Sequence, residues 1–232
     1  MIKGNARQHP ANRMKLVIFD IDGTLARTSN VDGHCFIPAL REHFDTSNFD
    51  TDWRNYPNVS NSGILETLSG RYFVRPASTE EANAFESAFM ARLREQPKSD
   101  FQAIPGANEM LALLRRTPGI SLAIAAGCWR ASADLKLRRA GIDVADIPMT
   151  TATDAQARTE ILRIAKQKAA ADQPDETLYF GDAEWDVCAT QELDWRMIGI
   201  GDRVDRLRAC GVPDCFQDFR EPDEILRVIN DG

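Results

Sequence analysis

The sequence predicts an α/β fold in which a parallel sheet is interrupted by a helical insertion. Short apolar runs alternate with segments of helical periodicity, and this alternation is typical of βαβ units. Residues 26–103 break the alternation and have a mostly helical pattern. The chain has 232 residues, more than one average domain and fewer than two, which suits one domain with a large insertion or two small domains.

Four apolar runs indicate the buried strands. They are short and bounded by Gly or Asp, as expected of strands inside a parallel sheet. Segments with helical periodicity lie between and after these runs, and Gly or Pro ends several of them. The predicted strands are 16–19, 121–125, 177–180 and, more weakly, 197–200, and the predicted helices are 107–116, 131–140, 159–170 and 187–193.

The insertion contains one clear helix start. Ser78 and Glu81 have the spacing of a capping box, in which each side chain accepts a hydrogen bond from the other residue's backbone N–H. Ala82, Phe85, Phe89 and Leu93 then follow one helical face, which indicates packing rather than ligand binding. We therefore expect a core domain of residues 14–25 and 104–232, an inserted helical domain of residues 26–103, and a flexible N-terminal segment of residues 1–13.

Composition excludes several functions. Lys and Arg total 28 against 35 Asp and Glu, so the net charge of −7 gives no basic surface for nucleic acid. Residues 1–13 are polar and lack the apolar core of a signal peptide, and no stretch approaches the roughly 20 apolar residues needed to span a bilayer. The five cysteines are odd in number and never spaced as Cys-x-x-Cys, which favours free thiols in the cytoplasm over disulfides or zinc. We expect no nucleic-acid partner and no membrane partner.

Acidic residues follow the first predicted strand, at Asp20 and Asp22 in the run Asp-Ile-Asp-Gly-Thr. Ligands of open α/β sheets bind beyond the carboxyl ends of the strands, where these two acids lie. A calcium loop starting at Asp20 would need Gly at its sixth position and Glu at its twelfth, but Leu25 and Val31 stand there. A simple strand-to-turn transition remains an alternative, because Asp and Gly are common in turns.

A second acidic motif follows the strand at 177–180. Asp182 lies at the strand tip, and Asp186 lies four residues later, where it could equally be an ordinary acid in the first turn of a helix. Three carboxylates from Asp20, Asp22 and Asp182 would repel one another unless a cation neutralised them. An all-oxygen site of this kind suits Mg²⁺.

These two motifs resemble those of the haloacid dehalogenase superfamily, whose members are mostly Mg²⁺-dependent phosphatases. Asp-x-Asp-Gly-Thr at 20–24 and Gly-Asp-x-x-x-Asp at 181–186 occur in the family's order, and the resemblance covers the chain from about residue 15 onward. The resemblance implies a Rossmann-like core with an inserted helical cap, which would be residues 26–103. It also implies a small phosphorylated substrate.

The resemblance assigns roles to the acids. Asp20 would be the nucleophile that forms an aspartyl-phosphate, and Asp22 the general acid and base. Mg²⁺ would be held by the Asp20 carboxylate, the Asp22 carbonyl and Asp182, with support from Asp186. An acid at position 22 also argues against dehalogenation, because true dehalogenases lack it.

Two positions depart from the family pattern. Ala126 stands where the second motif has Ser or Thr, so one hydroxyl donor to the phosphoryl group is missing. The backbone of Ala126 and Gly127 could still bind phosphate, and Thr150, Thr151 or Thr153 could supply a hydroxyl. Arg158 stands where the third motif has Lys; it keeps the charge, although an ordinary surface arginine is the alternative.

The predicted function is a Mg²⁺-dependent phosphohydrolase acting on a small phosphorylated metabolite. One alternative is a binding or regulatory module that has lost efficient turnover through Ala126. A less favoured one is a sugar-phosphate mutase, for which His34 is the candidate acid/base of the cap. Phosphonate cleavage is disfavoured because Lys98 is the only lysine of the insertion and lies at its exit.

The oligomeric state stays open. Candidate substrate contacts are Arg27, Ser60, Asn61, Arg71, Trp129 and Arg130.

Overall fold

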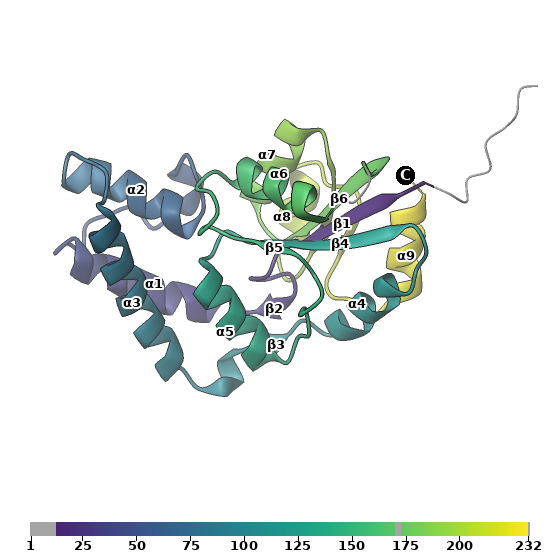
Figure 1. Cartoon of the computed structure of the whole chain (residues 1–232), viewed down its shortest axis with the longest axis horizontal. Coiled ribbons are helices and arrows are strands. Elements are labelled where there is room, and N and C mark those ends of the chain that lie inside the picture. Colours follow the sequence, from purple (N-terminus) through teal and green to yellow (C-terminus); the bar gives the residue numbers. More distant parts are fainter. Residues whose placement is uncertain (1–12, 170–172, 232) are drawn as a thin grey trace, which may run out of the picture.

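A computed structural model describes residues 13–169 and 173–231 of the chain (Figure 1). The predicted flexible segment, residues 1–13, lies outside the described residues except for Arg13. Among the helices of the described part, none combines the length and apolar character needed to cross a membrane.

The core is a six-stranded sheet in which all neighbouring strands are parallel. The strand order is β5-β4-β1-β6-β7-β8, so the first strand of the chain lies in the middle. The predicted α/β class is therefore confirmed, while the outer strands β5 and β8, only two residues each, were too short to predict. The strands are β1 Lys15–Phe19, β4 Ile120–Ala125, β5 Met149–Thr150, β6 Glu176–Gly181, β7 Arg196–Ile200 and β8 Cys215–Phe216.

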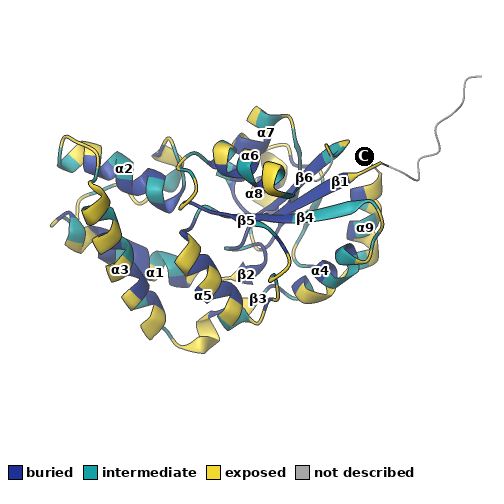
Figure 2. Cartoon of the chain, viewed as in Figure 1, coloured by how far each residue is buried: buried dark blue, intermediate teal, exposed yellow. Residues whose placement is uncertain are grey.

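Strand β1 is buried on both faces, as its continuous apolar run predicts (Figure 2). Alternate side chains point to opposite faces of a strand, so Val17 and Phe19 pack into one helical layer and Leu16 and Ile18 into the other. The Phe19 ring stacks on Phe180 of β6 with centroids 4.7 Å apart.

Helices cover both faces of the sheet. The first layer contains α4 (Ala107–Arg115), α5 (Arg130–Ala140) and α9 (Pro222–Asn230), whose buried residues join the cluster of Val17 and Phe19. The second contains α6 (Arg158–Ala169) and α7 (Glu184–Leu193). Helix α8 (Val204–Ala209) packs beside β7 and β8. Helix α7 begins three residues before the predicted start, because Glu184 and Asp186 of the second acidic motif lie in its first turn.

Residues 29–95 form three helices that lie to one side of the sheet: α1 Ser29–His43, α2 Asn61–Tyr72 and α3 Thr79–Glu95. The capping box of Ser78 and Glu81 is present at the start of α3, as predicted. Phe85, Phe89 and Leu93 are buried in a cluster that also includes Trp129, the N-cap residue of α5. The three helices therefore pack onto the sheet domain through α5. Single-turn helices lie at Trp53–Asn55 (η2) and Lys98–Asp100 (η3).

The chain enters and leaves this helical segment through a two-stranded antiparallel ribbon. Strand β2 (Ala26–Arg27) pairs with β3 (Gln102–Ala103), with Ala26 opposite Ala103 and Arg27 opposite Gln102. Both connections to residues 29–101 are thus held side by side directly after the first acidic motif.

Candidate active site

Asp20 lies at the carboxyl end of β1, between the ends of β4 and β6. This is the point where the strand order reverses, and ligands of open α/β sheets bind at such a point. The chain turns sharply after Asp20, with Gly23 at φ +82°. A Cβ at Gly23 would lie 2.1 Å from Asp182 Oδ2, so only glycine lets this turn approach the second acidic motif.

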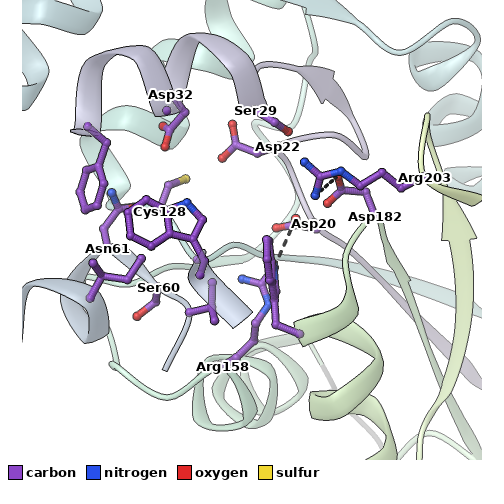
Figure 3. A pocket seen from close by; sticks show the side chains of 17 residues that line it. Asp20, Asp22, Ser29, Asp32, Ser60, Asn61, Cys128, Arg158, Asp182 and Arg203 are labelled. Atoms are coloured by element: carbon purple, nitrogen blue, oxygen red, sulfur yellow. Dashed lines mark ion pairs between the residues drawn. The ribbon is translucent and has the colours of Figure 1, made fainter. Parts of the chain in front are cut away.

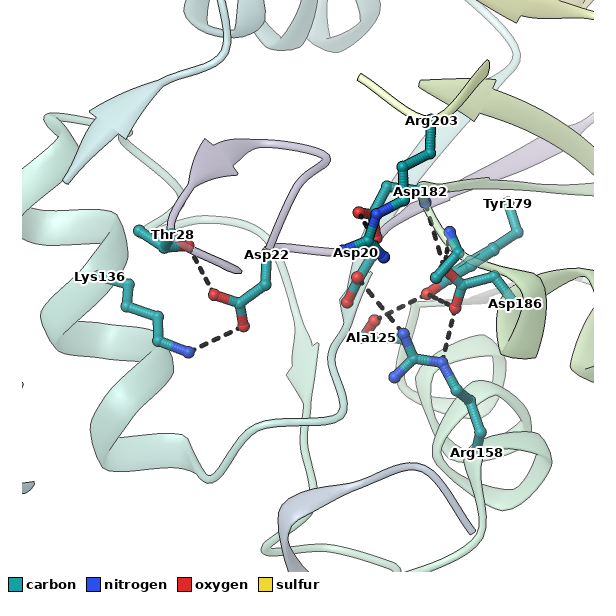
Figure 4. A network of polar contacts seen from close by, with 11 residues as sticks. Asp20, Asp22, Thr28, Ala125, Lys136, Arg158, Tyr179, Asp182, Asp186 and Arg203 are labelled. Carbon is teal, nitrogen blue, oxygen red and sulfur yellow. Dashed lines mark hydrogen bonds and ion pairs between the residues drawn. The ribbon is translucent and has the colours of Figure 1, made fainter. Parts of the chain in front are cut away.

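Asp182 and Asp186 lie at the end of β6 and in the first turn of α7. Asp186 Oδ2 accepts hydrogen bonds from the backbone N–H groups of Asp182 and Ala183, both at 3.2 Å. Its Oδ1 accepts from Arg158 Nε at 2.6 Å and from the Tyr179 hydroxyl at 3.3 Å (Figure 4). A carboxylate has about four acceptor sites, and here four donors use them. Asp186 therefore fixes the backbone that carries Asp182.

The donor set of this cluster fits Mg²⁺. Asp20, Asp182 and Asp186 are buried, and one carboxylate oxygen of each lies within 4.8 Å of the others. Burial, together with the neighbouring acids, raises the pKa of Asp20 well above its ordinary value despite Arg158. Burial and Asp186 raise the pKa of Asp182 to about 8. Hard oxygen ligands and uncompensated negative charge are the conditions under which a protein binds a divalent cation.

The raised pKa of Asp182 predicts how the stability of the metal-free protein changes with pH. The folded state keeps a proton on Asp182 that the unfolded state releases near pH 3.8, so the contribution of Asp182 to the free energy of unfolding should fall as pH rises from about 4 to about 8. A divalent cation bound at these carboxylates would replace that proton, so the stabilising effect of Mg²⁺ should grow with pH. At 100 times its Kd, a cation that binds only the folded state adds about 2.7 kcal/mol. Thermal unfolding in EDTA and in Mg²⁺ at several pH values measures both effects.

Asp182→Asn is the matched variant for that measurement. We expect it to flatten the pH dependence in EDTA and to reduce the Mg²⁺-induced rise in melting temperature. Equal Mg²⁺ shifts in the variant and in the natural protein would contradict a site built on Asp182.

Arg158 begins α6 and is buried. One Nη lies 3.3 Å from Asp20 Oδ2, while Nε binds Asp186. A Cβ at Gly127 would lie 2.4 Å from the other Nη, so a side chain at position 127 would collide with this guanidinium. The sequence alternative of an exposed surface arginine is wrong, since Arg158 is 8% exposed.

Asp22 belongs to a second, separate polar group. Its Oδ1 accepts a hydrogen bond from the Thr28 hydroxyl at 2.5 Å, and its Oδ2 accepts from Lys136 Nζ at 2.8 Å (Figure 4). Lys136 also forms an ion pair with Asp32 of α1. Burial lowers the pKa of Lys136, but Asp22 and Asp32 together raise it well above its ordinary value. The ammonium group is therefore permanently charged, and it joins α5 to the first motif and to α1.

Both polar groups border one pocket of about 160 Å³ (Figure 3). Loops at the carboxyl ends of the strands provide its floor, and α1, α2 and η2 provide the opposite wall. Charged residues lining it are Asp20, Asp22, Asp32, Arg158, Asp182 and Arg203; the others are Ser29, Gly33, Phe36, Trp53, Val59, Ser60, Asn61, Ile64, Gly127, Cys128 and Trp185.

The structure brings only part of the predicted site to this pocket. Asp20, Asp22, Arg158, Asp182 and Gly127 line it, as do Ser60 and Asn61. Asn61 reaches the pocket because its backbone N–H donates to the Gly127 carbonyl at 2.7 Å, which links the start of α2 to the loop after β4.

The other candidate contacts lie outside the pocket lining. Arg27 is exposed on β2, Arg71 lies over the Tyr56 ring, and Arg130 pairs with Asp134 one turn along α5. Trp129 is buried among Phe36, Phe85 and Phe89, and its indole N–H donates to Ser62. His34 is exposed, one residue beyond the lining residue Gly33. Proximity in sequence to a motif does not specify which way a side chain points from a helix.

Ala126 is fully buried in the core below the pocket. Its N–H donates to the Thr150 carbonyl at 3.0 Å, so the neighbouring strand approaches through its backbone. The Thr150 hydroxyl is buried without a hydrogen-bond partner among the described residues, the Thr151 hydroxyl binds Asp154, and the Thr153 hydroxyl accepts from the Arg130 N–H. These three threonines do not line the pocket.

Sequence reasoning missed Lys136, Asp32 and Arg203. A signal for Lys136 was present, because it lies on the same face of α5 as Ala133 and Ala140, where a charged residue needs a buried partner. Arg203 follows the end of β7 and lies 3.9 Å from Asp182 Oδ2, so the strand-end rule could have found it. Asp32 had no local signal, since its partner Lys136 is distant in sequence.

Comparison with known proteins agrees with this architecture. A family model described as haloacid dehalogenase-like hydrolase matches residues 17–200. A curated relative, Probable phosphatase IndB of Dickeya dadantii (strain 3937), is 34% identical over 129 residues, covering 55% of this chain and 54% of that protein. The match thus spans about half the length of that relative.

Solved structures share the fold. A protein of Bacteroides vulgatus provisionally named as a beta-phosphoglucomutase has a TM-score of 0.70 at 22% identity, covering 96% of this chain and 92% of that one. A variant of CbbY from Rhodobacter sphaeroides in complex with xylulose-(1,5)bisphosphate has a TM-score of 0.64 at 16% identity, with coverages of 90% and 96%. At these identities the likeness establishes a common architecture.

Proposed function

Because the chain belongs to the haloacid dehalogenase-like hydrolase family, we propose that it hydrolyses small phosphate monoesters with the help of Mg²⁺. The observation that carries this proposal is the position of Asp20 and Asp22. Both carboxylates lie after the central strand and border one pocket, but they have different partners, Arg158 for Asp20 and Lys136 for Asp22. Two carboxylates in different surroundings can serve as nucleophile and as acid/base.

The proposed metal ligands are the Asp20 carboxylate, the Asp22 carbonyl and the Asp182 carboxylate. Asp186 would act through the backbone of Asp182, because its own acceptor sites are already used. When bound, Mg²⁺ would neutralise negative charge where an anionic carboxylate meets an anionic phosphate. Residues 26–103 would form the cap that closes the pocket opposite the acids.

In the proposed reaction an Asp20 oxygen attacks phosphorus while the bond from phosphorus to the ester oxygen breaks. Asp22 gives its proton to that oxygen, and the alcohol leaves. Asp22 then removes a proton from water, whose oxygen attacks the phosphoryl group, so phosphate leaves and the Asp20 carboxylate is restored. Arg158 contacts Asp20, orients this carboxylate and offers its remaining N–H groups to the phosphoryl oxygens.

Phosphate release from a panel of monophosphates, with Mg²⁺ and with EDTA, tests the function. We expect Mg²⁺-dependent release from at least one ester of a small alcohol. The same release in EDTA would contradict the metal requirement, and no release above that of Asp20→Asn for any ester would contradict the hydrolase.

Ala126 motivates one alternative, a binding module with weak turnover. This alternative predicts that a hydroxyl at position 126 increases the rate. The variant Ala126→Ser restores a hydroxyl at the end of β4 and should raise kcat by about 10²-fold, since one transition-state donor is typically worth about 10²–10³ in rate. Serine is preferred to threonine because Ala126 is fully buried and extra methyl groups strain a packed core.

The control for this prediction is Ala131→Ser, on the exposed side of the first turn of α5. An unchanged kcat in Ala126→Ser would mean that another donor already does this work. Asn61→Ala in the same assay would then test the pocket amide that lies next to Gly127.

A further inference from the structure

The two sides of the pocket differ in charge. The floor carries two arginines, Arg158 and Arg203, beside its acids, whereas Asp32 is the one charged residue on the described part of the wall formed by α1, α2 and η2. We propose, on the basis of the proposed function, that this wall selects esters with a single phosphate and an alcohol that carries no second anionic group. In this proposal Asp32 is the residue that excludes the second anion.

The described part of the wall near Asp32 presents no positive charge to the pocket. Asp22 and Asp32 share one ammonium group, that of Lys136, so two carboxylates face one cation when Asp22 is ionised, and Asp32 alone balances it when Asp22 carries the proton of the proposed reaction. The Lys136 side chain is 0% exposed, while those of Asp22 and Asp32 are 22% and 20% exposed. A ligand in the pocket would therefore meet the carboxylates and not the ammonium. A second phosphate placed here would meet the Asp32 carboxylate and no accessible cation in the described part of that wall, and like charges brought together across an interface are costly.

The arginines of the helical segment cannot compensate from their positions. In the described residues each is exposed or partly exposed and lies outside the pocket lining. Four have other partners: Arg54 pairs with Asp52, Arg71 lies over Tyr56, Arg75 pairs with Glu81 and Arg92 with Glu42.

The same wall indicates which alcohols would fit. Phe36, Trp53 and Ile64 present apolar surface, and Asn61 and Ser29 present neutral polar groups. Asp32 can accept a hydrogen bond from a hydroxyl or an amine. The pocket volume of about 160 Å³ is below the roughly 300–1,000 Å³ typical of sites for drug-sized ligands. The expected alcohol is therefore small, with one apolar face and a hydroxyl or amino group opposite it.

Binding to the Asp20→Asn protein in Mg²⁺ tests the selection without turnover. The probes are matched pairs, fructose 6-phosphate with fructose 1,6-bisphosphate and glucose 6-phosphate with glucose 1,6-bisphosphate, and titration calorimetry gives each Kd. We expect the monophosphate to bind about 10-fold more tightly or better in each pair. Adding Asp32→Asn should reduce this preference, and adding Asn61→Lys, which places a cation on the same wall, should reduce it further or reverse it.

Glu80→Gln is the matched control, an acid-to-amide change at an exposed position of α3. It should leave the preference unchanged, and melting temperatures establish that each variant is folded. Equal or tighter binding of the bisphosphates, no binding by either member of both pairs, or a preference unaffected by both Asp32→Asn and Asn61→Lys would overturn the inference. Absence of phosphate release by the natural protein, with the preference intact, would instead overturn the proposed hydrolase and leave the selection standing.

Discussion

Replacing Asp20 with asparagine should lower kcat for phosphate release by about 10⁴-fold or more, because removal of a nucleophile from an acyl- or phosphoryl-transfer site costs on this order. An amide has the shape of the carboxylate but cannot form the aspartyl-phosphate. Acid-quenched natural protein should carry a phosphoryl group on Asp20 by mass spectrometry, and the variant should carry none.

A stability measurement separates this chemical loss from unfolding. Asp20 is buried beside Asp186, Asp182 and Asp22, and burial with these charges raises its pKa. A neutral side chain removes that repulsion, so in EDTA Asp20→Asn should unfold at the same or a higher temperature than the natural protein. Asp205→Asn, whose side chain is 96% exposed, serves as the control. Retention of a tenth of the natural activity in Asp20→Asn would exclude Asp20 as the nucleophile.

Replacing Lys136 with methionine should reduce the free energy of unfolding by about 3–5 kcal/mol. Methionine fills a similar volume, but the change leaves Asp22 and Asp32 without their shared cation. Removal of one partner from a buried ion pair costs this much because it leaves a buried charge uncompensated. Urea unfolding at neutral pH measures the loss.

A second substitution tests the cause. Lys136→Met with Asp32→Asn should be more stable than Lys136→Met alone, because it removes one of the two opposed carboxylates; coupling in such cycles is about 0.5–3 kcal/mol. Lys98→Met, at an exposed position, should change little. If Lys136→Met were as stable as Lys98→Met, the ion pairs of Lys136 would have no part in holding α5 to the first motif.

Much of the fold could be predicted because its signals are local. The apolar runs found β1, β4, β6 and β7, and the helical periodicities found four helices of the sheet domain, since burial on both faces leaves a continuous apolar strand. Strands β5 and β8 have two residues each, and their pairing depends on neighbours that only the folded chain brings close. No local pattern specifies such short edges.

The residues of the site also differ in whether local sequence signals or only tertiary contacts place them. Asp20, Asp22 and Asp182 follow predicted strands directly, so the strand-end rule placed them at one edge of the sheet. Arg27 and Arg130 are candidate substrate contacts by sequence, but the β2 pairing and the turn of α5 direct them to solvent. Asp32 and Lys136 come from helices far apart in sequence, and their ion pair exists only in the tertiary structure.

The central position of β1 has a consequence for how the chain folds. Its partner strands begin at Ile120 and Glu176, and Lys15 and Glu176 are separated by 161 residues. During synthesis this strand, which is buried on both faces in the folded protein, is made before its partners and stays unpaired at least until β4 has been made. Contacts this distant in sequence slow folding, and an unpaired apolar strand is prone to aggregate. Pairing of β2 with β3 would reduce the time for which β1 is unpaired, because it brings β1 near the start of the sheet that follows the insertion.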